Sequence, residues 1–281
     1  MKISQIGGAL ALAGLLATAP AYSGNIVLTG HDNDFHGTFG SLQANTAIAA
    51  ELAFVRNTSL LPVLTFDAGT QLTSRLTSLG IAFTNVNPLA ANVTDALFNA
   101  SLYSAFVVAS VSSCGGCDNP PGTGSILATH FAAITSFFNA GRGILAFAGA
   151  DDLAAYSFVP SAATNAGGSP PSSGYVQTLA GSSFSLPAVN GDITHNFFSE
   201  PGTAGLSAAY VVTERLGNAL TGTPETIALR GGTISGPPGT VTSGGGCTIS
   251  TGGTVPEPSS LALIALALGG LLGFSKRRRN T

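Results

Sequence analysis

The densest group of chemically capable side chains is the segment 30–37, which reads GHDNDFHG. Two carboxylates and two imidazoles fall within six residues there: His31, Asp32, Asp34 and His36. Histidine with aspartate suits zinc or a similar divalent metal, whereas oxygen ligands alone suit calcium. A polar loop whose aspartates cap the following helix and turn explains the same residues without a metal. The segment is a candidate metal site with a structural alternative.

Three further residues could complete an active site. Asp151 and Asp152 could act as general acid and base or as further metal ligands, although either could simply cap a helix that begins at Leu153. His195 could join them, but a lone histidine in a loop is more often only hydrogen-bonded. All of these residues follow predicted strands or late loops, and open α/β sheets bind ligands beyond the carboxyl ends of their strands.

The cysteines allow several interpretations. Cys114 and Cys117 are separated by two glycines, and a local disulfide is the default for such a pair in an exported chain. A redox pair or metal ligation is the alternative. Cys247 is left over and could pair between molecules or stay free.

Hydrophobic patterning predicts the elements that must position these residues. Apolar runs predict strands, and patterns with a helical period separate them. This alternation predicts a doubly wound α/β fold with a mainly parallel, flavodoxin-like sheet and helices on both faces. The strands are expected at 25–30, 61–66, 81–85, 105–110 and 143–148, with late strands at 210–213 and 227–229, and the helices at 42–56, 72–79, 94–102 and 126–140.

Both ends of the chain carry export features. Lys2, the apolar stretch 6–17 and the small residues 19–21 are typical of a secretory signal peptide, expected over 1–23. Near the other end, an apolar helix over 259–274 would span about 24 Å, slightly less than a ~30 Å hydrocarbon core. It is flanked by the motif Val255, Pro256, Glu257 and Pro258 and by the basic cluster Lys276, Arg277, Arg278 and Arg279, which should stay cytoplasmic.

This three-part tail closely resembles the PEP-CTERM sorting signal of Gram-negative bacteria. The resemblance implies export through the inner membrane, removal of the leader by a signal peptidase, and transient anchoring in the membrane by the transmembrane helix. An exosortase-type protease would then cleave near the motif and pass the protein to the cell surface or extracellular matrix.

The remaining chain is expected to form one domain. Residues 24–230 should be the α/β domain, with a Gly/Ser/Pro-rich loop insertion at 160–185, and 231–254 a Gly/Thr/Ser-rich linker before the sorting signal at 255–281. Between the two processed ends the chain has five arginines, no lysine and twelve acidic residues, a net charge of −7. Nucleic acid is therefore excluded as a partner, because it requires a basic surface.

The body also resembles the class I glutamine amidotransferase-like fold and its trehalose-utilisation-like relatives. The resemblance rests on 105–110, the helix 126–140, the run 139–149 and the sequence DITH at 192–195. Amidotransferases place a nucleophilic cysteine after the strand that ends near Ala148, where this chain has Gly149, Ala150 and Asp151. The departure argues against a glutaminase reaction.

Two functions are consistent with these features. The chain lacks GxSxG, HExxH, a phosphate-binding loop and GxGxxG. This favours a non-catalytic surface or matrix protein that binds a carbohydrate or a cation, and leaves an exopolysaccharide open as a partner. The alternative is an extracytoplasmic hydrolase in which the 31–36 loop, with Asp151 or Asp152 and His195, holds a metal that activates water.

Overall fold

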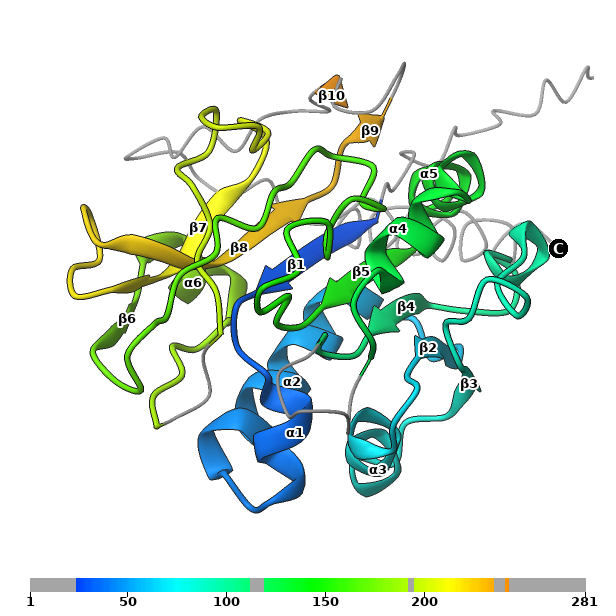
Figure 1. Ribbon diagram of the computed structural model, residues 1–281, viewed down its shortest axis with the longest axis horizontal. Helices are drawn as coiled ribbons and strands as arrows, with labels where there is room; N and C mark the ends of the chain where they lie inside the picture. The colour runs from blue at the N-terminus through cyan, green and yellow to red at the C-terminus, as the bar shows by residue number, and fades with distance from the viewer. Residues whose placement is uncertain (1–23, 112–118, 192–194, 235–240, 243–281) are drawn as a thin grey trace, which may run out of the picture. The chain divides into compact units, whose positions relative to one another are not determined.

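The computed structural model describes residues 24–111, 119–191, 195–234 and 241–242. A mixed eight-stranded sheet forms the centre of the domain, in the order β3-β2-β4-β5-β1-β8-β7-β6 (Figure 1). The strands from β3 to β1 are parallel, and β8, β7 and β6 continue the sheet in antiparallel pairing. The bounds are β1 Asn25–Thr29, β2 Val63–Phe66, β3 Phe83–Val86, β4 Ala105–Val108, β5 Gly143–Ala146, β6 Tyr175–Gln177, β7 Val211–Leu216 and β8 Thr223–Arg230.

The expectation of a mainly parallel α/β sheet is confirmed, but the flavodoxin-like strand order is wrong. In a flavodoxin-like sheet β1 lies between two parallel strands of the same wound unit. Here β1 pairs with β5 in parallel and with β8 in antiparallel, with Asn25 opposite Arg230 and Thr29 opposite Thr226. The late strand β8 takes the position beside β1, and β2 lies three strands away.

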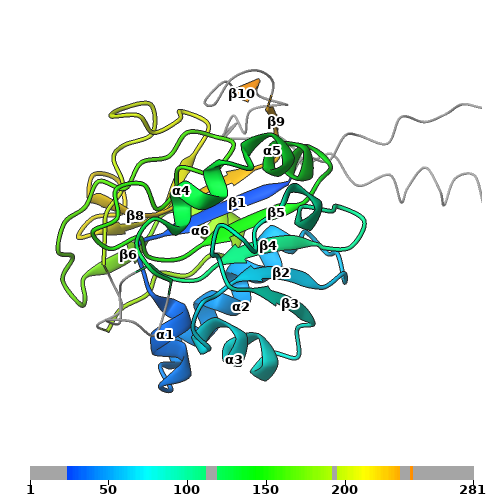
Figure 2. The same cartoon turned by 45° about the vertical axis from the view of Figure 1, so that its right-hand side comes forward.

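Helices cover both faces of the sheet (Figures 1 and 2). Alternate residues of β1 contribute to two cores: Ile26 and Leu28 belong to the core that includes α5, and Val27 to the core that includes α2 and α3. All three side chains are fully buried, which stabilises the fold by roughly 1.5–3 kcal/mol for each. The helices are α1 Asn33–Thr38, α2 Leu42–Arg56, α3 Gln71–Ser78, α4 Thr123–Ala128, α5 Phe131–Asn139 and α6 Leu179–Phe184, with a short 3-10 turn at Asp95–Leu97.

The helix expected over 42–56 has those bounds as α2. The Ser41 hydroxyl accepts a hydrogen bond from the Ala44 N–H, and Asn57 ends the helix in the left-handed region at φ 45°. The helix expected over 126–140 is instead two helices, α4 and α5. The break falls at Thr129 and His130, where the His130 ring lies 2.6 Å from an Asp95 carboxylate oxygen.

The expectation of an irregular insertion over 160–185 is wrong in part, because this segment contains β6 and α6. Thr178 caps α6 through the Gly181 N–H at 3.1 Å, and Tyr175 and Phe184 are buried. Phe184 stacks on Phe54 of α2 with ring centroids 5.0 Å apart. A few well-placed apolar residues are enough to attach a polar segment to the core.

Two short strands, β9 Thr233–Ile234 and β10 Val241–Thr242, lie within the segment expected as a linker. Ile234 is buried, its backbone carbonyl accepts from the side-chain amide of Asn139 in α5, and its N–H donates to the Oδ1 of the same side chain. Among the described residues no helix is long and apolar enough to cross a membrane. The expected signal peptide at 1–23 and the expected transmembrane helix at 259–274 lie outside them.

Candidate functional site

The first strand delivers the candidate residues to the carboxyl edge of the parallel sheet. β1 ends at Thr29, and Asp32 occupies the N-cap position of α1 without making a side-chain cap hydrogen bond. His31, Asp32 and Asp34 are buried, with no side chain more than 1% exposed. The sequence predicts one metal site in this loop. In the structure His31, Asp32 and Asp34 instead contact three different sets of partners.

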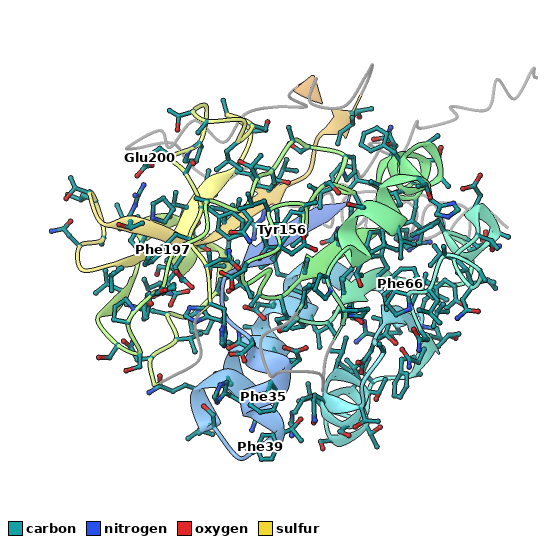
Figure 3. All side chains as sticks on the ribbon, viewed as in Figure 1. Phe35, Phe39, Phe66, Tyr156, Phe197 and Glu200 are labelled. Atoms are coloured by element: carbon teal, nitrogen blue, oxygen red, sulfur yellow. The ribbon has the colours of Figure 1, made fainter. Side chains whose placement is uncertain are left out.

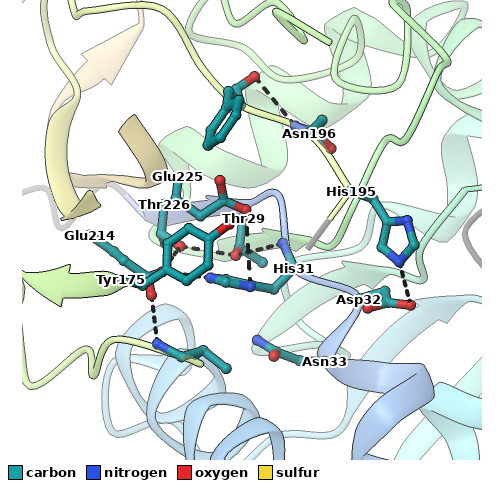
Figure 4. A network of polar contacts seen from close by, with 12 residues as sticks. Thr29, His31, Asp32, Asn33, Tyr175, His195, Asn196, Glu214, Glu225 and Thr226 are labelled. Carbon is teal, nitrogen blue, oxygen red and sulfur yellow. Dashed lines mark hydrogen bonds and ion pairs between the residues drawn. The ribbon is translucent and has the colours of Figure 1, made fainter. Parts of the chain in front are cut away.

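The Asp32 carboxylate lies between two imidazoles. Its Oδ2 is 3.0 Å from Nε2 of His195 (Figure 4). Its Oδ1 is 3.5 Å from Nε2 of His36, four residues later on α1. One donor atom from each of the three residues lies within 4.8 Å of the other two. No other group of three His, Cys, Asp or Glu donors is this close in the part of the chain that the structure describes. The structure thus brings two predicted ligands, Asp32 and His36, together with His195, which the hydrolase alternative included as a further residue of the site.

Asp32 is a buried carboxyl group with unusual surroundings. Both of its carboxylate oxygens are inaccessible to solvent, and neither accepts a hydrogen bond of normal geometry from a described residue. Burying an ionised carboxylate costs several kcal/mol unless it is paired and hydrogen-bonded. Its polar neighbours are imidazole nitrogens, which are metal donors when neutral. Donors that share a tetrahedral zinc ion at ~2.0–2.2 Å lie ~3.3–3.6 Å apart. The separation of 3.5 Å between Asp32 and His36 lies in this range, and that of 3.0 Å between Asp32 and His195 is slightly shorter.

His195 is held in place by its backbone and by the next residue. Its N–H donates to the Gly30 carbonyl at 2.7 Å. The Asn196 Oδ1 accepts from the Gly149 N–H at 2.7 Å and from the Tyr156 hydroxyl at 3.2 Å. A Cβ on Gly30 would lie 1.9 Å from the Asn196 carbonyl oxygen, so glycine is required for this close approach.

His31 belongs to a second cluster, although it is adjacent to Asp32. Figure 4 shows the two side chains directed to different sides. The His31 Nε2 lies 2.8 Å from Oε2 of Glu214, which also accepts from the Thr226 hydroxyl at 2.7 Å. Tyr175 meets the His31 ring edge-on at 5.2 Å. His31 therefore joins the end of β1 to β6, β7 and β8, and the expectation that it shares a metal with Asp32 is not met.

Two more carboxyl groups are buried near His31. Oε1 of Glu225 is 4.0 Å from Nδ1 of His31. Burial raises the pKa of Glu225 well above its usual range. Burial also raises the pKa of Glu51 to about 8, and the Asn33 amide donates to its Oε1 at 3.3 Å. Sequence reasoning missed Glu51, Glu214 and Glu225. One pattern in the sequence could have identified these three residues: each is an acidic residue within an otherwise apolar strand or helix face.

Asp34 has a separate role. Its carboxylate accepts from the backbone N–H of Ser110 at 2.9 Å and from the Ser110 hydroxyl, which ties α1 to the end of β4. Burial raises its pKa to about 7, with the two Ser110 hydrogen bonds acting in the opposite direction. Asp34 was expected as a ligand beside Asp32. Its oxygens are engaged by Ser110 instead.

Asp152 has a structural role, but the expected helix at Leu153 is wrong, because the chain forms turns over 151–158. The Asp152 carboxylate accepts from the N–H groups of Gly122 and Ala154, both at 2.9 Å, and so organises the turn that precedes α4. Asp151 is exposed. Neither belongs to the group formed by Asp32, His36 and His195.

Several predicted residues lie outside the described part of the chain. They are the candidate disulfide Cys114 and Cys117, the extra Cys247, the motif Val255, Pro256, Glu257 and Pro258, and the basic residues Lys276, Arg277, Arg278 and Arg279.

Comparison with known proteins identifies the C-terminal segment. Residues 254–279 match the family model described as the PEP-CTERM protein-sorting motif. This match supports export, processing by an exosortase, and a location at the cell surface or outside the cell. No curated protein and no solved structure matches the chain, so the resemblance of the body to the glutamine amidotransferase-like fold has no support.

Proposed function

We propose that this exported protein binds a divalent transition-metal ion, of the zinc class, through Asp32, His36 and His195. The observation that carries the proposal is the Asp32 carboxylate, which is fully buried, lacks normal hydrogen bonds and faces two imidazole Nε2 atoms. A cation bound there would compensate a charge that is otherwise costly to bury.

The donor set favours zinc over calcium. Calcium takes six to eight oxygen ligands, whereas two imidazoles and one carboxylate are a typical zinc set. The local backbone supports this choice, because α1 presents Asp32 and His36 four residues apart and the Gly30 carbonyl fixes the third donor segment. The carbohydrate ligand that the sequence left open has no comparable support among the described residues.

Elemental analysis of the full chain, purified without chelators, tests the proposal. The wild type should contain close to one zinc per chain, and Asp32→Asn and His195→Ala should lose most of it. His130→Asn is the matched control, because His130 contacts Asp95 and lies outside the donor group. Equal metal content in the wild type and Asp32→Asn, or no metal after zinc is added back, would refute the site.

A further inference from the structure

The coordination number of the site indicates what a bound metal could do. Structural zinc sites are closed by four protein ligands, whereas catalytic sites supply three and leave one position for water or substrate. The described donors at this site are three: Asp32, His36 and His195. An inference about chemistry here rests on the proposed function, since it requires the metal.

The site is reached from its histidine side. The Asp32 side chain is 0% exposed, whereas those of His36 and His195 are 25% and 30% exposed. Beside His36, the Phe35 ring lies 5.1 Å away, and Phe39, 69% exposed, lies 4.8 Å from Phe35 (Figure 3). An open position on the metal would therefore border solvent and an exposed aromatic surface.

The acidic surroundings of the site and its single group of three donors favour a carboxylic ester over a phosphate ester as the substrate. Phosphoryl transfer commonly uses two metals ~3.5–4 Å apart that clamp the anionic centre. One three-donor group is found among the residues that the structure describes. Asp32 and Asp67 both interact unfavourably with the neighbouring Asp34 carboxylate, so the surroundings are acidic. A neutral ester meets less repulsion there than a phosphate.

We propose that the metal at Asp32, His36 and His195 keeps an exchangeable position, activates water there, and hydrolyses neutral carboxylic esters. The bound water releases a proton to bulk solvent, and its oxygen forms a bond to the ester carbonyl carbon. The bond between that carbon and the alcohol oxygen then breaks, and the leaving alkoxide takes up a proton. Ester and water give acid and alcohol, with no other reactant.

The first experiment examines the open position directly. Zinc in the full chain is replaced by cobalt, whose visible spectrum reports coordination, and acetohydroxamate is added. The spectrum should change as the hydroxamate occupies the exchangeable position. An unchanged spectrum in cobalt-loaded protein would overturn this inference and leave metal binding intact. Failure to bind cobalt or zinc at all would overturn both.

The second experiment measures hydrolysis of 4-nitrophenyl acetate and 4-nitrophenyl phosphate by the zinc-loaded chain. Acetate hydrolysis by Asp32→Asn with the same zinc present should fall close to the rate of the metal-free wild type, because the variant lacks a metal ligand, and hydrolysis by His130→Asn should be unchanged. Phosphate hydrolysis should be slower than acetate hydrolysis. Equal acetate rates in the wild type and Asp32→Asn would overturn the activity, and faster cleavage of the phosphate would overturn the substrate class.

Discussion

Glu214 and Glu225 lie on neighbouring antiparallel strands and both approach His31, yet their surroundings differ. Glu214 accepts hydrogen bonds from Thr226 and from the Val189 N–H, in addition to its 2.8 Å contact with His31. Neither oxygen of Glu225 has a hydrogen-bond partner among the described residues. Because burial raises the pKa of Glu225, it is expected to be neutral in the folded protein, whereas Glu214 is the ion-pair partner of His31.

The two glutamates should therefore respond differently to the same substitution. Glu225→Gln replaces a neutral acid by a neutral amide of the same shape and should change the free energy of unfolding by less than about 1 kcal/mol. Glu214→Gln removes one partner of a buried ion pair and should cost on the order of 3 kcal/mol. Urea unfolding at pH 7 with a chelator present measures both. Equal costs would mean that Glu225 is charged in the folded state.

At the scale of elements, the candidate site depends on how closely the 195–198 segment approaches β1. Gly30 allows that approach, since a Cβ there would lie 1.9 Å from the Asn196 carbonyl oxygen. Gly143, at the start of β5, allows a similar approach to α2, where a Cβ would lie 2.1 Å from the Val55 carbonyl oxygen. Both glycines leave room for a close approach of two backbone segments, and Gly30 is the one that lies next to the candidate donors Asp32 and His195.

Substituting each glycine by alanine distinguishes an effect on the stability of the fold from an effect on the position of His195. Both Gly30→Ala and Gly143→Ala should destabilise the fold by roughly 1–3 kcal/mol, because backbone must shift. Gly30→Ala should also weaken zinc binding about 10- to 100-fold by displacing His195. Competition with a colorimetric chelator measures affinity in each variant that remains folded by circular dichroism. Similar affinities in the two variants would show that the Gly30 contact does not position His195.

The sequence predicts those elements whose signals lie within the element itself, and it does not predict contacts that depend on strand pairing. Local signals located α2 to the residue, because its cap and its apolar spacing lie within the helix itself. They could not give the direction of β8, whose burial on both faces resembles that of the parallel strands. Asp32 and His36 were found because they are close in sequence. The distant Glu214 and Glu225 were missed, because their contact with His31 depends on strand pairing that patterning does not encode.

For the molecule as a whole, folding removes several carboxyl groups from water. Burial raises the pKa of Asp34 to about 7 and that of Glu51 to about 8, and it raises that of Glu225 as well. Between the ordinary values near 4 and these raised values, the folded state binds more protons than the unfolded state. The free energy of unfolding should therefore be greatest at acidic pH and decrease as pH rises through this window.

Chemical denaturation of chelator-treated protein at pH 5 and at pH 8.5 checks this expectation. The wild type should be less stable at the higher pH, and Glu51→Gln should show a smaller decrease because one proton-binding group is removed. Zinc should oppose the trend, since metal ligands bind in their deprotonated forms. A wild-type protein that gains stability with rising pH in the absence of metal would contradict the assigned protonation of these carboxyls.

The position of β1 between β5 and β8 has a consequence for secretion. The strand nearest the amino terminus is bordered by the fifth strand and by the eighth, so about 200 residues separate it from its antiparallel partner. A chain that is threaded through a membrane from its amino terminus cannot complete this sheet until β8 has crossed. The strand order thus delays completion of the eight-stranded sheet until β8 has emerged, because β1 has no antiparallel partner before then.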